Sequence, residues 1–455
     1  METALDGLRD RLPSTALVTD PDVMQAYRYD NADLAEAGQP LGVVLAAGTG
    51  DVVETLRWAT EHRVPVVPRG AGTGLSGGAA AVEGGIVLSL AKMTAIREID
   101  AENQLAVVEP GVINADVGRA AAPHGLCYPP DPSSFEISTI GGNLATNAGG
   151  LRCVKYGVTR DAVLGLEVVL ADGRTIHTGG RTVKSVAGYD LTRLFVGSEG
   201  TLGVITAATL RLRPTPRATP VTFVASFPTL PAAGRAVADI SRSGSDPCLL
   251  ELLDNISINL IEDYRRMDLD RSAAALLLGQ SDSGTAAADV EAMADLCRRA
   301  GADLVVTADD PAEGEMLLEA RRAHYHAVAA RGATLVDDVG VPRGRLPELL
   351  AGIQEVAEQH DVLISTVGHA GDGNVHPTFV FPPDDHAARD RALRAAEVVC
   401  RLAISLGGTI TGEHGVGSLK RAWLADEIDD ATLSAHRAVK QALDPLGILN
   451  PGKAI

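Results

Sequence analysis

Apolar residues in the first 215 positions gather in short runs separated by Gly-rich segments, a pattern typical of strands and loops rather than long helices. One stretch, 51–62, has the spacing of an amphipathic helix. Asp172-Gly173 is a hairpin turn signal within 163–179, so two further strands are expected there. The remaining runs predict strands at 41–47, 64–67, 86–90, 94–99, 105–110 and 203–214.

The pattern changes after Pro214 and Pro216, where strand-like and helix-like segments alternate. Such alternation favours a separate α/β domain with a sheet covered by helices. The predicted strands are 221–227, 248–253, 273–279, 302–308, 334–342 and, with a break, 362–381. The predicted helices are 230–240, 255–266, 284–299 and 343–359.

Three Gly-rich loops lie at 68–79, 138–150 and 195–206; the first directly follows a predicted strand, and the third leads into one. The first contains a formal G-x-G-x-x-G, but it leads into another strand, whereas a Rossmann loop opens a helix. We interpret it as a nest of backbone N–H groups around a diphosphate, with Arg69 nearby; a plain surface loop is the alternative.

The second loop has two Gly-Gly pairs that bracket Asn143, Thr146 and Asn147. Small residues there allow a flat ring to lie against the backbone, and the amides and hydroxyl can bond its edge; alone, the segment also fits a tight turn. A cofactor with phosphate, sugar and ring parts explains all three loops together.

Charge and composition restrict the function classes. The chain has 455 residues and a net charge of −19, which argues against nucleic acid or anionic lipid as a partner. No apolar run approaches the roughly 20 residues of a membrane span, and the N-terminus lacks the pattern of a secretory signal. Five scattered cysteines without C-x-x-C argue against an iron–sulfur cluster and a disulfide framework, so we expect a cytoplasmic protein.

His369 and His376 flank a flexible run in GHAGDGNVHP, residues 368–377. On a continuous helix the two rings would be about 10 Å apart, too far to share an ion. A Gly-rich turn can instead fold the chain back and bring the rings together. Taken alone, the pair also fits two buried histidines bonded to backbone carbonyls.

Six blocks carry a resemblance that covers nearly the whole chain. PRGAGTGLSGGA, DPSS with IGGNLATNAGG, and GSEGTLGVIT resemble the FAD-binding domain of the vanillyl-alcohol oxidase/p-cresol methylhydroxylase (PCMH) superfamily. GHAGDGNVHP, TGEHGVG and LDPLGILNPGK are similar to the group of FAD-linked D-2-hydroxyacid dehydrogenases, which includes D-lactate dehydrogenase, D-2-hydroxyglutarate dehydrogenase and the glycolate oxidase FAD-binding subunit.

The resemblance implies an α+β chain: a two-subdomain PCMH-type FAD-binding domain over 1–215, an α/β cap of antiparallel sheet covered by helices over 216–408, and a 409–455 segment that returns to the FAD domain. Some relatives bind FAD covalently through a histidine at the position of Thr73, so non-covalent FAD is expected here. Lys453 and Asn450 lie in a tail that resembles the flavin-contacting end of the family; a frayed C-terminus is the alternative. The residues expected at FAD are Pro68, Arg69, Gly70, Ala71, Gly72, Thr73, Gly74, Ser76, Pro132, Ser133, Gly141, Gly142, Asn143, Thr146, Asn147, Gly149, Gly150, Glu199, Gly200, Gly203, Ile205 and Asn450.

The resemblance also implies a divalent metal held by His369, His376 and Glu413, a set that suits Zn, Mn or Fe. Asp372 and Asn374 are expected to orient the rings. His414 is implied as the general base that takes the substrate hydroxyl proton, with hydride passing to flavin N5.

An arginine in LLEARRAH is implied for the substrate carboxylate. It aligns as Arg321, but the tryptophan of the family pattern is Leu318 here, so Arg322 stays an alternative. The expected partners are a small anionic 2-hydroxy acid and an electron acceptor, which can be a quinone, an electron-transfer flavoprotein or a cytochrome.

Three hypotheses follow. The first is FAD- and metal-dependent oxidation of a D-2-hydroxy acid to the 2-oxo acid. The second is a flavin-binding subunit that needs a partner chain for electron transfer, and the third is a flavin-free metal hydrolase. Attachment at the inner face of the membrane, without an integral segment, and a homodimer are options for location and assembly.

Overall fold

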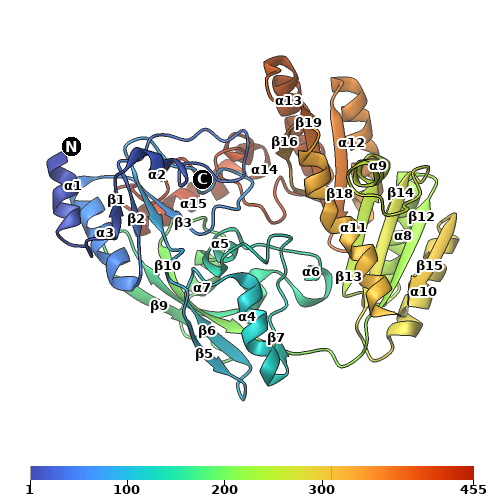
Figure 1. Cartoon of the computed structure of the whole chain (residues 1–455), viewed down its shortest axis with the longest axis horizontal. Helices are drawn as coiled ribbons and strands as arrows, with labels where there is room; N and C mark the ends of the chain where they lie inside the picture. The colour runs from blue at the N-terminus through green and yellow to red at the C-terminus, as the bar shows by residue number, and fades with distance from the viewer. Residues whose placement is uncertain (1, 309) are drawn as a thin grey trace. The chain divides into compact units, whose positions relative to one another are not determined.

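The computed structural model describes residues 2–308 and 310–455, which divide into two compact units (Figure 1). Unit 1 comprises the chain up to residue 149, 157–215 and 413–455; unit 2 comprises 150–156 and 216–412. The domain limits expected from the sequence stay a prediction. Among the described residues, no helix combines the length and apolar character needed to cross a bilayer.

The first sheet of unit 1 has the strand order β1-β2-β4-β3. Strands β2, β4 and β3 pair in parallel, and helix α3 (Thr49–His62) connects β2 to β3. Buried residues of the sheet, of α1 (Glu2–Arg9) and of α3 form one core. The C-terminal tail joins this sheet, since the N–H of Asn450 donates to the carbonyl of Val66 over 2.8 Å. The strands are β1 (Leu17–Val18), β2 (Gly42–Leu45), β3 (Val66–Arg69) and β4 (Ile86–Ser89).

The second sheet of unit 1 is antiparallel, with the order β5-β6-β10-β8-β9. Its buried face shares a core with α4, α5 and α7. The strands are β5 (Ile96–Asp100), β6 (Leu105–Val108), β8 (Val163–Val169), β9 (Thr175–Gly179) and β10 (Val204–Arg211); β7 (Leu126–Cys127) and β11 (Arg213–Pro214) form a separate pair. The other helices are α2 (Pro21–Gln25), α4 (Asn114–Ala121), α5 (Ile140–Thr146), α7 (Leu191–Phe195), α14 (Leu424–Glu427) and α15 (Asp430–Leu443).

Unit 2 is built on one antiparallel sheet with the order β15-β12-β14-β13-β18-β19-β16, to which β17 adds by pairing with β19. The strands are β12 (Val221–Phe227), β13 (Leu249–Asp254), β14 (Ala275–Ser281), β15 (Leu304–Ala308), β16 (Ala333–Val336), β17 (Val339–Gly340), β18 (Leu363–His369) and β19 (Asn374–Phe381).

Helices cover this sheet in two groups. One group, α9 and α11, packs on the face that carries Leu249 and Leu253, because alternate strand residues point to the same side. The other group contains α8, α10 and α12. These helices pack against the sheet, and α8 contacts both α10 and α12. The helices are α6 (Cys153–Tyr156), α8 (Leu230–Arg242), α9 (Asn255–Tyr264), α10 (Ala286–Arg299), α11 (Pro311–Ala329), α12 (Leu346–His360) and α13 (His386–Ser405).

The predicted fold class is confirmed: unit 1 has two sheet subdomains and unit 2 has an antiparallel sheet covered by helices. The predicted hairpin at Asp172-Gly173 joins β8 to β9. The sequence pattern did not assign α13 or α15. Five of the seven buried residues of α13 are alanine, and α15 buries only Leu433, so neither helix carries a row of large buried apolar side chains.

Candidate functional site

The two histidines of GHAGDGNVHP lie on a β-hairpin of unit 2. His369 ends β18, Asn374 begins β19, and the two residues pair across the turn. His376 pairs with Val367, so both histidines point to the same face of the sheet. Their ring centroids are 5.0 Å apart. The Gly-rich turn therefore does bring the rings together, as the sequence predicted.

A buried glutamate on the neighbouring strand orients His369. Glu251 of β13 pairs with His369 of β18, and its Oε1 is 2.7 Å from Nδ1 of the imidazole. A carboxylate only accepts, so Nδ1 carries a proton, and in the neutral ring Nε2 then keeps the lone pair. This tautomer is the one that can ligate a metal through Nε2.

Arg321 bonds the second oxygen of the same glutamate. Its Nε donates to Oε2 of Glu251 over 2.8 Å, and its side chain is 7% exposed. Arg322 points elsewhere: it is exposed and forms an ion pair with Glu315. Leu318, in place of the expected tryptophan, is buried in the apolar core beneath α11. Of the two arginines, only Arg321 lies beside the histidine pair.

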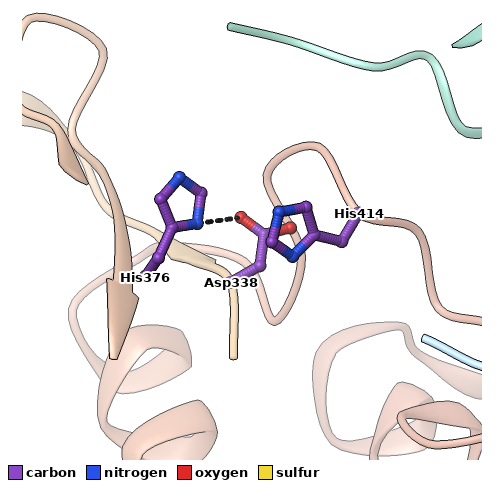
Figure 2. A group of neighbouring side chains, drawn as sticks. All are labelled: Asp338, His376 and His414. Atoms are coloured by element: carbon purple, nitrogen blue, oxygen red, sulfur yellow. Dashed lines mark ion pairs between the residues drawn. The ribbon is translucent and has the colours of Figure 1, made fainter. Parts of the chain in front are cut away.

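His376 has an acidic neighbour of its own. Figure 2 shows His376 and Asp338, whose Oδ1 is 3.6 Å from Nδ1 of the imidazole. Asp338 accepts hydrogen bonds from Nδ2 of Asn374 (2.7 Å) and from Oγ1 of Thr411 (2.8 Å). Asn374 was expected to orient the histidine rings directly. It bonds instead the carboxylate of Asp338, which lies beside His376.

A chain of buried hydrogen bonds runs beneath Arg321. His324 is one helical turn further along α11, and its Nε2 is 2.9 Å from Oγ of Ser365. Ser365 bonds Oγ of Ser257, which donates to Asp254 over 2.6 Å. Burial lowers the pKa of His324 well below its ordinary value, so this ring is neutral. Burial also raises the pKa of Asp254 to about 6, although hydrogen bonds from Ser257 and Thr366 oppose the rise.

The first Gly-rich loop of unit 1 presents backbone donors without protein acceptors. It follows β3, and in the described part of the chain none of the backbone N–H groups of 71–78 donates to another protein group. Buried Arg69 stands at the start of the loop, and Lys453 reaches its far end, where Nζ donates to the carbonyl of Gly77 over 2.7 Å. Successive N–H donors between two cations fit a diphosphate.

The three Gly-rich loops meet within unit 1. A Cβ on Gly70 would overlap Oγ1 of Thr139, in the second loop. Gly200, in the third loop, lies so close to Pro68 that a Cβ would be 3.0 Å from its ring. The N–H of Glu199 donates to the carbonyl of Ala145 over 2.8 Å. The expectation that all three loops serve one cofactor is supported by this convergence.

Glu199 links the third loop to the tail. Its carboxylate accepts from the N–H groups of Val416 and Gly417, at 2.8 Å each, and burial raises its pKa to about 7. Asn450 donates through Nδ2 to the carbonyls of Gly78 and Glu199. Its Oδ1 is buried and has no hydrogen-bond partner in the described part of the chain. An unsatisfied acceptor beside the loop fits a donor supplied by a bound group.

The polar side chains of the second loop bond groups within the loop and in neighbouring segments. Oγ1 of Thr139 caps α5, and Asn143 is buried and bonded to Asn114. Thr146 bonds the carbonyl of Gly142, and Oδ1 of Asn147 accepts from the N–H of Arg160.

The other residues expected at FAD range from buried core positions to an exposed one. Ile205 lies in the apolar core of the second sheet, and a Cβ on Gly203 would overlap Val168. Ser133 is exposed, whereas Pro132 is buried. Gly149 packs so closely on Glu413 that a Cβ would overlap the carboxylate, and Gly150 belongs to unit 2.

Glu413 and His414 belong to unit 1. Nε2 of His414 is 3.9 Å from Oε1 of Glu413, and Oγ of Ser76 donates to the carbonyl of His414 over 2.9 Å. The backbone of the E-H-G motif is thus tied to the first Gly-rich loop. The metal set of His369, His376 and Glu413 stays a prediction. Within unit 2, its two histidines lie side by side.

Sequence reasoning missed Glu251 and Asp338. Both are 0% exposed. Each had a signal: Glu251 is the one charged residue in CLLELL, and Asp338 stands in TLVDDVGVP. A charge inside an apolar strand is costly unless it is paired, so such a residue predicts a buried partner elsewhere in the chain.

Comparisons with known proteins identify the family to which the chain belongs. Residues 215–454 match the family described as FAD linked oxidases, C-terminal domain, and residues 40–179 match the FAD binding domain family. A glycolate oxidase subunit GlcD of Bacillus subtilis is 46% identical over 94% of this chain and 91% of its own length. A D-lactate dehydrogenase of Archaeoglobus fulgidus is 38% identical over 94% of this chain and 95% of its own length.

Among solved structures, p-cresol methylhydroxylase with bound substrate superposes with a TM-score of 0.85 at 18% identity, over 100% of this chain and 96% of that one. That likeness concerns the fold. The sequence matches concern the family, and both family profiles are FAD-linked. The chain belongs to the FAD-linked oxidases and is an FAD-linked oxidoreductase.

Proposed function

We propose that this chain oxidises a small D-2-hydroxy acid, of the glycolate, lactate or 2-hydroxyglutarate class, to the 2-oxo acid, with non-covalent FAD and a divalent metal. The observation that carries the proposal is the group in unit 2: two histidine rings 5.0 Å apart, one of them oriented by Glu251, with a buried arginine on the same glutamate. The names of the relatives, a glycolate oxidase subunit and a D-lactate dehydrogenase, support the substrate class.

Unit 1 supplies the groups for FAD. Its unpaired N–H groups of 71–78, with Arg69 and Lys453, suit the diphosphate, and the acceptor Oδ1 of Asn450 suits a donor at a ring edge. When bound, FAD accepts the hydride from the substrate carbon. Thr73 has no ring nitrogen for a covalent flavin link, which is why we propose dissociable FAD.

Unit 2 supplies two metal ligands and the anion site. Nε2 of His369 and the ring of His376 would hold Zn, Mn or Fe, with Glu413 proposed as the third ligand on the motif alone. When bound, the metal polarises the substrate hydroxyl and lowers its pKa.

Arg321 has Nε on Glu251, so its terminal nitrogens remain for the substrate carboxylate. His414 is proposed to take the hydroxyl proton.

An anaerobic reduction screen tests the proposal. The purified protein, loaded with FAD and Zn²⁺ or Mn²⁺, is mixed with D- and L-lactate, glycolate, and D- and L-2-hydroxyglutarate while the flavin absorbance is followed. We expect bleaching by D- but not L-acids. A protein that takes up no FAD, or a flavin that no 2-hydroxy acid reduces, would contradict the proposal.

The second candidate is a flavin-binding subunit that transfers electrons only through a partner chain, and the name "glycolate oxidase subunit" of a relative favours it. Steady-state turnover with an artificial dye separates the two candidates. Sustained turnover by the isolated chain supports an enzyme that works alone. Flavin reduction without turnover supports the subunit.

The flavin-free metal hydrolase loses its basis, because both family profiles are FAD-linked. The electron acceptor is also a proposal, and it can be a quinone, an electron-transfer flavoprotein or a cytochrome.

A further inference from the structure

We propose that Glu251 is the positioning residue of the metal-binding group, a proposal that rests on the metal-assisted oxidation above. Glu251 fixes His369 as the tautomer that presents Nε2 to a metal, and Arg321 holds Glu251 in place. One buried carboxylate therefore stands between the residue proposed for the cation and the residue proposed for the substrate anion.

The geometry leaves Glu251 little freedom. It lies in the middle of β13, between β14 and β18, with 0% of its side chain exposed. Oε1 meets Nδ1 of His369 at 2.7 Å and Oε2 meets Nε of Arg321 at 2.8 Å. Each oxygen has a different donor, so rotation of the carboxylate would break both hydrogen bonds. A charged group this deeply buried is stable only with such partners.

The charges explain why a glutamate is needed rather than a neutral acceptor. Its negative charge offsets the guanidinium of Arg321, which would otherwise be a buried cation beside the site proposed for a divalent metal. It also makes the imidazole of His369 a better donor of its Nε2 lone pair. Asp338 lies at 3.6 Å from His376, which is too far for a hydrogen bond of the same kind.

Glutamine at this position reverses the polarity of one contact. In Glu251→Gln, the amide oxygen accepts from the charged Arg321 and the NH₂ group faces Nδ1 of His369. Nδ1 must then accept, so the ring proton moves to Nε2 and blocks the ligand atom. We expect a 10- to 100-fold loss of metal affinity, the range typical of lost outer-shell partners.

Glu262→Gln is the matched control. Glu262 is also buried in unit 2, but its carboxylate accepts from the backbone N–H groups of Met267 and Leu269, away from the histidines. The metal-stripped full chain is titrated with Zn²⁺ and with Mn²⁺ against a chromophoric chelator. Glu262→Gln should keep the wild-type affinity, and unchanged affinity in Glu251→Gln would overturn the proposal.

A second measurement depends neither on the folding of Glu251→Gln nor on metal. Imidazole ¹⁵N shifts of the metal-free wild type, assigned with His369→Gln, report which nitrogen carries the proton. We expect the Nδ1–H tautomer; the Nε2–H tautomer would overturn the proposal. If the wild type binds no metal, the metal-assisted mechanism fails, whereas the tautomer still decides the role of Glu251.

Discussion

At the scale of residues, the structure distinguishes neighbours that the sequence leaves equivalent. Arg321 and Arg322 are adjacent, but successive residues of a helix point about 100° apart. One guanidinium is therefore buried on Glu251, while the other is exposed beside Glu315. The lysine variants test this difference: Arg321→Lys should weaken binding of D-lactate about tenfold, the equivalent of one charge-assisted hydrogen bond.

Arg322→Lys is the matched control and should bind D-lactate like the wild type, because its partner Glu315 is exposed and such pairs contribute little. Binding is measured from the perturbation of the oxidised flavin spectrum by oxalate, an unreactive analogue that stands in for D-lactate. Equal losses in both variants would refute the assignment of Arg321.

Asp254 makes stability depend on pH. Burial raises its pKa from 3.8 to about 6, so the folded state holds the proton more tightly than the unfolded chain. The stability contributed by the protonated carboxyl is full below pH 4 and is lost as the pH rises through about 6, a change on the order of 3 kcal/mol. Urea unfolding between pH 4 and pH 7.5 should show this decline, with a shallower slope in Asp254→Asn.

The quantity to compare is the slope of unfolding free energy against pH, not the absolute stability. In the wild type the backbone N–H of Thr366 donates to the Asp254 carboxylate. In Asp254→Asn the amide NH₂ can face that N–H, which would lower the stability at every pH without changing the slope. Asp303→Asn, at an exposed position of unit 2, is the control and should keep the wild-type slope. Identical slopes in wild type and Asp254→Asn would show that Asp254 does not titrate in this range.

At the scale of elements, the β18–β19 hairpin decides the site. The turn between His369 and Asn374 reverses the chain, and pairing of the two strands then places the rings on one face. Gly373 permits the turn: its φ is +78°, and a Cβ would overlap the carbonyl oxygen of Val341. A longer or displaced turn would shift the register and send one histidine to the opposite face.

Gly373→Ala should therefore lower the free energy of unfolding by about 3 kcal/mol, because a steric overlap adds to the backbone cost. Gly407→Ala is a close control: its φ is also +78°, but a Cβ there meets nothing within 4 Å. It should cost only about 1 kcal/mol. Urea unfolding checks both, and equal losses would show that the contact with Val341 is unimportant.

At the scale of the whole molecule, the candidate cofactor groups divide between the units. The loops proposed for FAD lie in unit 1, and the paired histidines lie in unit 2. Metal removal should therefore leave the flavin in place. After dialysis against a strong chelator, we expect unchanged flavin absorbance but reduction by D-lactate slowed about 100-fold or more, since a Lewis acid contributes several kcal/mol.

Adding Zn²⁺ or Mn²⁺ back should restore the rate, which controls for damage during dialysis. Rapid reduction by a protein shown to be free of metal would remove the metal from the mechanism. Loss of the flavin together with the metal would show that the two cofactors do not bind independently.

The sequence by itself determined much of this protein. Alternating and continuous apolar runs predicted most strands, Asp172-Gly173 predicted its hairpin, and the Gly-rich run of the H-x6-H block predicted the turn that brings two histidine rings together. These features are local: each depends on side chains close together in the chain. The sequence pattern did not assign the Ala-rich α13 or the largely exposed α15, because neither helix carries a row of large buried apolar side chains.

Only the tertiary structure decided how distant residues meet. Glu251 is 118 residues from His369 and 70 from Arg321, and its role follows from strand pairing and from the position of α11 over the sheet. The convergence of the three Gly-rich loops and the tail has the same origin. A hydrogen bond depends on distances of a few tenths of an ångström, and packing of the folded chain, rather than spacing along it, sets such distances.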